Sequence, residues 1–285
     1  MKAIVEIKGG FGNQIFQFAF AQHLRRLGYK VKVSLNHLNT NTHGIVKREI
    51  VISPQIYGFK EANINWVKLC KLLHKMSESR KASVIYKNFI NPLFSKFSKL
   101  SNFEKSKPKR LSYFDGYWQD VEILAKEKKF IIESIEKVPL LEKCFEKKIK
   151  DGSTLVLVRR TDYLSMQEDL SVSFYENALH FCRNNVNNFN YEIFTDDIEW
   201  VNKQDCFSDA LKIHPPSNEP SEILEIFNAM INFENYIVGN STFSLVAAVL
   251  SETNNSRVIV SDPWFRNSNK YMNYKKNWIK IKNQI

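Results

Sequence analysis

Cysteine is scarce in this chain: its 285 residues include only four cysteines, which stand far apart and form no CxxC pair. Such spacing favours buried free thiols over a disulfide framework or a zinc site. The chain also lacks any run of about 18 apolar residues, so the sequence predicts no membrane-spanning segment. Its first apolar run is interrupted by Glu6 and is too short for a secretion signal. We therefore expect a cytoplasmic protein.

Acidic residues are outnumbered by basic ones. Lys and Arg total 41 against 30 Asp and Glu, which gives a net charge of +11. This balance favours an anionic partner, such as nucleic acid, a phospholipid surface or a phosphate-bearing small molecule, and it does not choose among them. Apolar residues make up 44% of the chain and aromatic residues 13%, which excludes intrinsic disorder and provides core for two domains or one large one.

The chain is predicted to begin with a strand, a loop, a helix and a second strand. Residues 3–7 and 29–35 are rich in β-forming side chains. Between them, a glycine loop at residues 9–14 leads into apolar residues at helical spacing, and Gly28 ends this helix.

A basic segment follows in which apolar residues also recur at helical spacing. Residues 66–107 are predicted to be largely helical, and an amphipathic helix is expected near residues 121–138. The apolar stripe of the basic segment and the lysines beside it are Ile90, Leu93, Phe94, Phe97 and Leu100, with Lys87, Lys96 and Lys99. Such a stripe suits peripheral contact with an anionic inner membrane. Packing of the stripe onto the core, with the lysines merely solvated, is the favoured alternative.

Beyond a lysine-rich linker at residues 142–151, the pattern changes to short apolar runs that alternate with helices. Buried parallel strands are predicted at residues 154–158, 191–194, 236–239 and 258–261. Helices are predicted at residues 173–183, 219–231 and 243–250, the second with Asn218 as its N-cap and Pro220 in its first turn. The sequence thus predicts an α/β protein of two domains, residues 1–145 and 146–285.

Polar groups follow four of the predicted strands. Ligands of open α/β sheets bind beyond the carboxyl ends of the strands, so these groups form the candidate site. They are Gly10, Gly12, Asn13 and Gln14 after the first strand, Arg159, Arg160 and Asp162 after residues 154–158, Asp196 and Asp197 after residues 191–194, and Asn240, Ser241, Thr242 and Phe243 after residues 236–239.

The start of the helix at Phe243 is the best phosphate candidate, because a helix N-terminus offers free N–H groups and a positive dipole end. Ordinary capping by Ser241 or Thr242 is the alternative. Arg159 and Arg160 are expected to point to opposite faces, so that one grips a phosphate as a fork while the other pairs with Asp162.

The glycine loop does not fit the GxGxxG dinucleotide pattern. It is either a flexible turn or a place where Gly10 and Gly12 let the backbone approach a ligand, with Asn13 and Gln14 presenting amide donors. The sequence contains no DxD, HExxH, Walker A or GxSxG motif, so a metal is not indicated.

Five segments, in this order, carry a family resemblance: GGFGNQIFQFAFA (residues 9–21), FDGYWQ (114–119), VRRTDY (158–163), IFTDDIEW (193–200) and GNSTFSLVAAVLS (239–251). Together they resemble the bacterial α-1,2-fucosyltransferase family, the family 11 type of glycosyltransferases. The resemblance implies a GT-B architecture of two Rossmann-like domains facing a central cleft, with the acceptor mostly on the N-terminal domain and the GDP-sugar donor mostly on the C-terminal one. It also implies no metal and no other cofactor.

The implied reaction is inverting transfer of L-fucose from GDP-L-fucose to O-2 of a galactose-like residue, in the synthesis of surface polysaccharide such as O-antigen or capsule. The implied partners are the GDP-sugar and a galactose-terminated glycan. One alternative is transfer of another 6-deoxyhexose, such as colitose, from its GDP donor. A second, of a different class, is a basic protein that binds nucleic acid or anionic glycan, although the sequence shows no RRM, KH or helix-turn-helix signature.

The resemblance also implies roles for individual residues. In the HxRRxD motif of the family the first arginine contacts the donor pyrophosphate, and here that arginine is Arg159, with Arg160 and Asp162 as companions. Leu157 stands where the family has histidine. Similarity of the glycine loop to that of protein O-fucosyltransferases places Asn13 at the sugar–phosphate junction. Arg159, Asp162 and Asn13 are thus the candidate catalytic residues, and Asp196 or Asp197 is expected to hold guanine N–H groups or ribose hydroxyls.

The acceptor is expected to bind near an aromatic cluster in the N-terminal half. The candidate acceptor residues are Asp115, Tyr117, Trp118 and Gln119. Core packing is favoured over sugar stacking for at least two of Phe114, Tyr117 and Trp118. The sequence identifies no general base: Asp115, Asp120 and Glu6 are candidates, and the donor phosphate is the alternative.

Overall fold

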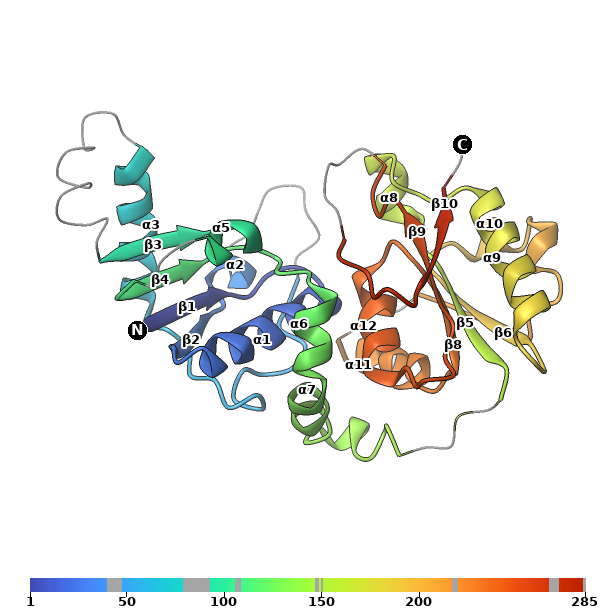
Figure 1. Ribbon diagram of the computed structural model, residues 1–285, viewed down its shortest axis with the longest axis horizontal. Helices are drawn as coiled ribbons and strands as arrows, with labels where there is room; N and C mark the ends of the chain where they lie inside the picture. Colours follow the sequence, from blue (N-terminus) through green and yellow to red (C-terminus); the bar gives the residue numbers. More distant parts are fainter. Residues whose placement is uncertain are drawn as a thin grey trace. The chain divides into compact units, whose positions relative to one another are not determined.

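The computed structural model describes residues 1–39, 48–78, 93–105, 109–146, 149, 151–216, 220–266 and 272–283. The chain divides into two compact units (Figure 1). Unit 1 comprises Met1–Gln119 and Lys126–Val138, and unit 2 comprises Asp120–Ala125 and Pro139–Ile285. Each unit is built around its own parallel sheet.

Unit 1 contains a four-stranded sheet in the order β2-β1-β4-β3. Its strands are β1 (Lys2–Glu6), β2 (Lys30–Ser34), β3 (Phe94–Phe97) and β4 (Leu111–Phe114), and all neighbours pair in parallel. The helices are α1 (Phe11–Arg26), α2 (Asn36–Asn39), α3 (Ile64–Glu78), α5 (Leu100–Glu104) and α7 (Lys128–Ile135). The strands predicted at residues 3–7 and 29–35 are confirmed, as is the helix between them.

The two main helices of unit 1 cover opposite faces of its sheet. Val67 and Cys70 of α3 pack with Ile4 and Tyr113 on one face. On the other face, Phe20 of α1 meets Phe114 edge-on, with ring centroids 5.3 Å apart. Because side chains alternate along a strand, each face has its own core.

The prediction that residues 66–107 are largely helical is wrong beyond Glu78, since β3 and the short helix α5 occupy the later part. Phe94 and Phe97 are three residues apart, which puts them on one side of a helix but on opposite faces of a strand. Phe94 packs into the core on the α3 side of the sheet. Phe97 stacks on Phe114 on the other side, with ring centroids 5.2 Å apart. Two residues of the proposed membrane stripe are therefore buried in two different cores, while Leu93 is 49% exposed; Lys87 and Ile90 lie outside the described residues.

The amphipathic helix predicted near residues 121–138 is two helices, α6 (Val121–Lys126) and α7. The interruption is at Glu127, whose buried carboxylate pairs with Arg26 of α1 at 2.9 Å. This residue also lies near the change from unit 2 to unit 1.

Unit 2 contains a six-stranded parallel sheet in the order β10-β9-β8-β5-β6-β7. Its strands are β5 (Ser153–Val158), β6 (Asn190–Thr195), β7 (Lys212–His214), β8 (Asn235–Gly239), β9 (Val258–Asp262) and β10 (Ile279–Lys282). Its helices are α8 (Thr161–Met166), α9 (Val172–Asn185), α10 (Ile198–Val201), α11 (Pro220–Met230) and α12 (Thr242–Ser251), with 3-10 turns η2 (Pro139–Leu141) and η3 (Asp205–Phe207). The predicted strands and helices of this half are confirmed; Asn218 lies outside the described residues.

The centre of unit 2 is buried and mostly apolar. All six residues of β5 are buried, because this strand lies in the middle of the sheet. Helix α12 is buried from Ser244 to Ser251, which includes Leu245 and Val246. The predicted α/β class with parallel sheets is confirmed, and polar groups of unit 2 must gather where its strands end.

Candidate active site

In unit 2, polar side chains meet at the carboxyl ends of β5, β6 and β8. The turn after β5 begins with Arg159 and Arg160 and continues directly into α8. The turn after β6 carries Asp196 and Asp197, and the turn after β8 leads into α12. Since β5 lies between β6 and β8 in the sheet, its arginines stand between the other two turns.

Arg159 is held by two carboxylates. Its Nε and Nη2 donate to the two oxygens of Asp162 at 2.9 and 3.0 Å, and its Nε lies 3.1 Å from Oδ2 of Asp196. Burial alone would lower the pKa of Arg159, but its hydrogen bond to Asp162 and the charges of both carboxylates raise that pKa above its usual value. Its side chain is 33% exposed. A permanently charged, oriented guanidinium is therefore presented at the end of β5.

Arg160 has a different environment. It is 13% exposed, pairs with Asp169 at 3.2 Å and Asp197 at 3.3 Å, and its guanidinium carbon lies 4.1 Å from the centroid of the Trp200 ring. The prediction that one of the two arginines pairs with Asp162 is confirmed, and that arginine is Arg159; which of the two binds phosphate stays a prediction. The pair forms because Asp162 lies three residues after Arg159, in the first turn of α8, where the two side chains are neighbours.

Asp196 and Asp197 both bind donors of the protein. Asp196 accepts from the Arg160 backbone N–H at 2.8 Å and from the Thr161 hydroxyl at 2.6 Å. Asp197 is the N-cap of α10 and accepts from the Trp200 N–H at 3.0 Å. The pair thus ties the turn after β5 to the turn after β6. Their contact with guanine or ribose stays a prediction.

The N-terminus of α12 is connected to the arginine turn by Tyr163. The Tyr163 hydroxyl donates to the backbone carbonyl of Asn240 at 3.2 Å, and the centroid of its ring lies 5.9 Å from the guanidinium carbon of Arg159. Burial is the main cause that raises the pKa of Tyr163 to about 12, so it remains a neutral donor. Sequence reasoning did not single out Tyr163, although it ends the VRRTDY segment.

The side chains at the start of α12 mostly serve the helix itself. Ser241 caps it by accepting from the Phe243 N–H at 3.3 Å, as the capping alternative predicted. Asn240 is 3% exposed and donates to the carbonyl of Glu168 at 2.6 Å, so its side chain is structural rather than donor-binding. Thr242 and Phe243 are half-buried. A ligand at the start of α12 would therefore bind the backbone N–H groups of the first helical turn rather than these side chains.

In unit 1, the loop between β1 and α1 brings Asn13 and Gln119 together. Gln119 Nε2 donates to Asn13 Oδ1 at 2.7 Å. Gly9 has a φ of +78°, and a Cβ there would meet Asn13 Nδ2 at 2.9 Å and Tyr117 Cε1 at 3.1 Å. Gly9 is thus required both by the backbone conformation and by the close packing of these side chains. Gly10 is the N-cap of α1 and Gly12 lies in its first turn.

Gln14 is not a ligand-facing residue, which corrects the prediction that it presents a free amide. It is 1% exposed, donates to the carbonyls of Gly9 at 3.0 Å and Glu49 at 2.8 Å, and accepts from the Val51 N–H at 3.1 Å. Its polar atoms hold the glycine loop against residues 49–51.

The aromatic cluster separates into buried and exposed members. Phe114 and Trp118 are buried, and Trp118 stacks on Phe20 with ring centroids 4.3 Å apart. Core packing of two of the three aromatic residues is therefore confirmed, and the prediction that Trp118 contacts the acceptor is wrong. Tyr117 is 40% exposed, with Lys8 Nζ 5.1 Å from its ring centroid, and provides the aromatic surface.

The carboxylates considered as general bases are engaged elsewhere. Glu6 is 1% exposed and accepts from the Tyr113 hydroxyl at 2.7 Å and the His37 N–H at 2.6 Å, which removes it as a candidate. Asp120 accepts from the Ile123 N–H at 2.8 Å. Asp115 pairs with Lys8 at 2.8 Å and Lys96 at 3.3 Å; burial acts to raise its pKa, but the two ammonium groups lower that pKa below its usual value.

The sequence profile of glycosyl transferase family 11 matches residues 3–282. The chain belongs to glycosyl transferase family 11. This membership makes it a glycosyltransferase, and the resemblance seen in the sequence is confirmed.

Two curated relatives from Escherichia coli span nearly the whole chain. The α-1,2-colitosyltransferase is 26% identical over 310 residues, covering 98% of each chain. The O-antigen biosynthesis glycosyltransferase WbnK is 22% identical over 303 residues, covering 96% of this chain and 99% of the relative. Among solved structures, the α-1,6-fucosyltransferase NodZ soaked with GDP-fucose matches with a TM-score of 0.47 and 11% identity, over 87% of this chain and 92% of NodZ. No helix among the described residues has the length and apolar character needed to cross a bilayer.

Proposed function

We propose that this glycosyltransferase transfers L-fucose from GDP-L-fucose to O-2 of a galactose-like residue, with inversion, in the synthesis of a surface polysaccharide such as O-antigen. The family membership and the names of the two relatives support a sugar transfer of this kind. The observation that carries the proposal is Arg159, a fixed guanidinium at the carboxyl end of β5 that Tyr163 connects to the N-terminus of α12.

The chemistry requires groups that stabilise a departing nucleoside diphosphate. As the bond between the sugar and the phosphate breaks, positive charge develops on the sugar ring and negative charge collects on the diphosphate. Asp162 and Asp196 bind Arg159 through Nε and Nη2, which leaves Nη1 without a partner among the described residues. Arg159 Nη1 and the backbone N–H groups at the start of α12 are the fixed donors for that negative charge.

We further propose that no metal takes part. A guanidinium and a helix N-terminus both stabilise phosphate charge, which is the function that a divalent cation has in other transferases. Asp196 and Asp197 are adjacent and bind Arg159, Arg160 and the N-terminus of α10, so their oxygens are already matched to cationic and N–H donors.

We place Asn13 at the junction of sugar and phosphate, and on the acceptor side we assign the aligning role to the exposed face of Tyr117. Gln119 fixes the Asn13 amide, and Gly9 allows Tyr117 to lie against it. Asp115 is a weak base because its two lysine partners lower its pKa. The leaving phosphate is therefore the better acceptor for the proton of the attacking hydroxyl.

A second donor, GDP-colitose, is favoured by two observations. The relative with 26% identity is an α-1,2-colitosyltransferase. In addition, Leu157 near the carboxyl end of β5 replaces the histidine of the family motif, two residues before Arg159. A hydrocarbon side chain cannot hydrogen-bond a hydroxyl, and colitose has one hydroxyl fewer than fucose.

A donor panel tests the proposal. GDP-L-fucose, GDP-colitose, GDP-mannose and UDP-galactose would each be offered with a galactose-terminated acceptor, and the released nucleotide and the linkage of the product would be measured. We expect release with a GDP-6-deoxyhexose, retention of activity in EDTA, and a 1,2-linked product. Turnover confined to UDP-galactose, or a product linked elsewhere than at O-2, would refute the assignment.

A further inference from the structure

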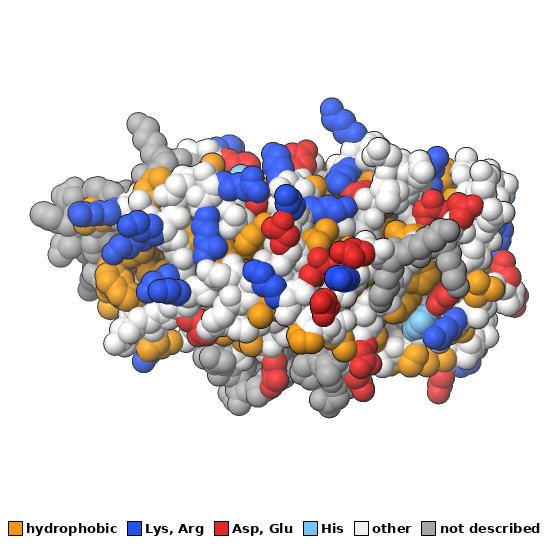
Figure 2. Space-filling model, turned by 90° about the horizontal axis from the view of Figure 1, so that it is seen from below, with side chains coloured by type: hydrophobic (Ala, Val, Ile, Leu, Met, Phe, Trp, Pro, Cys, Tyr) orange, Lys and Arg blue, Asp and Glu red, His pale blue; other side chains and the backbone are white. Residues whose placement is uncertain are grey.

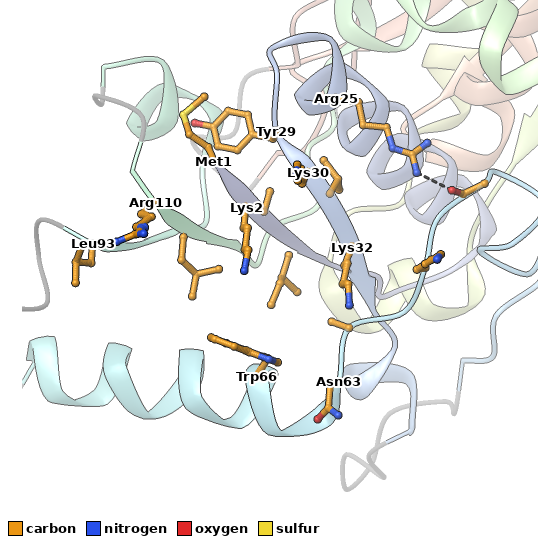
Figure 3. A pocket seen from close by; sticks show the side chains of 17 residues that line it. Met1, Lys2, Arg25, Tyr29, Lys30, Lys32, Asn63, Trp66, Leu93 and Arg110 are labelled. Carbon is orange, nitrogen blue, oxygen red and sulfur yellow. Dashed lines mark hydrogen bonds between the residues drawn. The ribbon is translucent and has the colours of Figure 1, made fainter.

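Unit 1 contains a groove that the proposed reaction does not use. Its volume is about 1030 Å³, and it lies between α3 and the amino ends of β1, β2 and β4 (Figure 3). The glycine loop with Asn13 follows the carboxyl end of β1, at the opposite end of the same strand. The groove is therefore separate from the candidate acceptor residues.

The lining of this groove is cationic. Six basic side chains line it and no Asp or Glu does: Lys2, Arg25, Lys30, Lys32, Lys60 and Arg110. Lys2 of β1 and Lys30 of β2 are direct partners in the parallel register, so their side chains leave the sheet on the same face. Like charges in such positions destabilise a sheet, which is unexpected in the absence of an anionic partner.

Most of these cations are available. Lys30, Lys32, Lys60 and Arg110 are exposed, and none forms an ion pair within the part of the chain that the structure describes. Arg25 differs, because it donates to the Gly58 carbonyl at 2.6 Å and its guanidinium carbon lies 3.6 Å from the centroid of the Phe59 ring. An anion in the groove would thus meet several uncompensated positive charges.

Large apolar side chains lie beside the charges. Trp66, Leu93 and Met1 line the groove and are 50%, 49% and 45% exposed. Along α3, Leu69 and Leu72 are also exposed. In Figure 3, Trp66 projects from α3 toward the strands that carry Lys2 and Lys32, and its ring centroid lies 5.9 Å from Lys2 Nζ. Exposed apolar residues with a charged rim mark interaction surfaces.

We propose that this groove is the docking surface of the protein for an anionic phospholipid bilayer. Headgroup phosphates bind Lys2, Lys30, Lys32 and Arg110, while Trp66, Leu93 and Met1 lie at the level where headgroups meet acyl chains. Unit 1 as a whole carries 25 Lys and Arg against 9 Asp and Glu. Figure 2 shows Lys and Arg flanking hydrophobic side chains on unit 1.

Bilayer lipid fits these residues better than nucleic acid does. A single-stranded nucleic acid is bound by cations together with aromatic rings that stack on its bases. Here Tyr29 is buried, so Trp66 is the exposed aromatic ring of the lining, and it is accompanied by Leu93 and Met1, which insert among acyl chains but offer no stacking plane. The surface shares Leu93 with the stripe predicted in the basic segment, whose phenylalanines are buried.

Vesicle co-sedimentation tests the proposal with the full chain. Vesicles of phosphatidylcholine alone and vesicles with one third phosphatidylglycerol would be compared at low salt and at ~0.5 M salt, where surface charges are screened. We expect binding that requires phosphatidylglycerol. The triple variant Lys30→Gln, Lys32→Gln and Arg110→Gln should bind about 100-fold more weakly at low salt, since each charge near the surface contributes about fivefold.

A matched triple variant separates local from overall charge. Lys105→Gln, Lys126→Gln and Lys129→Gln remove three exposed charges from the same unit, and none of these lines the groove. This control should lose less than tenfold in binding. Trp66→Ala should lose about tenfold at both salt concentrations, because its contribution is apolar, whereas Leu211→Ala, a 67% exposed leucine of unit 2, should change nothing.

These outcomes test the docking surface and leave the transferase assignment unaffected. The rate of transfer to a soluble acceptor should be the same in all these variants. Equal binding to both kinds of vesicle, binding to neither, or equal losses in the two triple variants would each overturn the proposal. Binding of a short RNA that depends on Lys30, Lys32 and Arg110, without vesicle binding, would identify nucleic acid as the partner and would also overturn it.

Discussion

The two units use charge in opposite ways. Unit 1 has a net charge of +16, from 25 basic and 9 acidic residues, whereas unit 2 has 16 basic and 21 acidic residues and a net charge of −5. In unit 2, Arg159 and Arg160 are fixed by aspartates at the carboxyl ends of the strands. In unit 1, lysines on the amino ends of β1 and β2 line a groove without a carboxylate.

This difference shows why the overall charge of +11 was a poor guide. A carboxylate pair orients an arginine and makes it specific, which suits a phosphate that must be held in one place. An unpaired lysine is a mobile, hydrated charge, which suits a surface of many anions. The fold therefore places the basic residues in two settings, which suit two different kinds of anion.

The largest expected effect comes from removing the oriented arginine of unit 2. Arg159→Ala should lower kcat/KM by about 10²–10³-fold, since a fixed donor to developing charge is lost. Arg159→Lys should also fail substantially, because an ammonium cannot bind Asp162 through two parallel N–H donors. Steady-state release of GDP, with thermal unfolding to check the fold, measures this.

A matched control for Arg159 exists in the same unit. Arg183 binds both oxygens of Asp209 at 2.9 Å, on α9, away from the strand ends that carry the arginine turn. Arg183→Ala should leave transfer unchanged. Near-normal turnover of Arg159→Ala, or an equal loss in both variants, would contradict the donor site.

The second effect concerns the ion-paired carboxylate of unit 1. Asp115→Asn should lower the free energy of unfolding by about 2 kcal/mol at pH 7, because Lys8 and Lys96 lose their partner. The folded-state pKa of Asp115 is lowered, so its contribution is present at neutral pH and is lost as the pH falls below about 4 and through that folded-state pKa. Urea unfolding of both proteins at neutral and acidic pH should show the difference shrink toward zero.

An exposed pair in unit 1 is the control for Asp115. Lys129 and Glu133 on α7 lie 3.8 Å apart and are 88% and 61% exposed. Glu133→Gln should change the free energy of unfolding by less than about 0.5 kcal/mol. A pH-independent loss in Asp115→Asn would mean that the carboxylate contributes by packing rather than by charge.

A smaller effect tests the donor. Leu157→His should raise the ratio of kcat/KM for GDP-L-fucose over GDP-colitose by up to about tenfold, which is the effect of one hydrogen bond. Both donors are measured with the same variant protein, so a loss of folded protein lowers both values of kcat/KM equally and leaves their ratio unchanged. An unchanged ratio would show that residue 157 does not meet the part of the donor in which the two sugars differ.

The smallest expected effect is that of chelation. If Arg159 and the N-terminus of α12 stabilise the leaving group, EDTA should leave the rate unchanged within error, and added Mg²⁺ or Mn²⁺ should not raise it. A strict requirement for either ion would refute the metal-free proposal and would require a different role for Asp196 and Asp197.

Local sequence determined much of this protein. Continuous apolar runs such as Thr154–Val158 can only be buried strands, helical periodicity set α9, α11 and α12, and the strand-end motifs located the arginine turn. The family resemblance added the predicted role of Arg159 in contacting the donor pyrophosphate, which composition alone could not give. These features were readable because each depends on residues adjacent in the chain.

Tertiary structure decided the rest, because it depends on residues far apart in the chain. The pairing of β3 with β4 converts Phe94 and Phe97 from a helical stripe into members of two cores. Burial, not residue type, makes Gln14 and Trp118 structural while leaving Tyr117 exposed. The register of β1 and β2 brings Lys2 beside Lys30, 28 positions later, and so creates the cationic groove. Strand register and burial are properties of non-local pairing, which no local pattern of the sequence encodes.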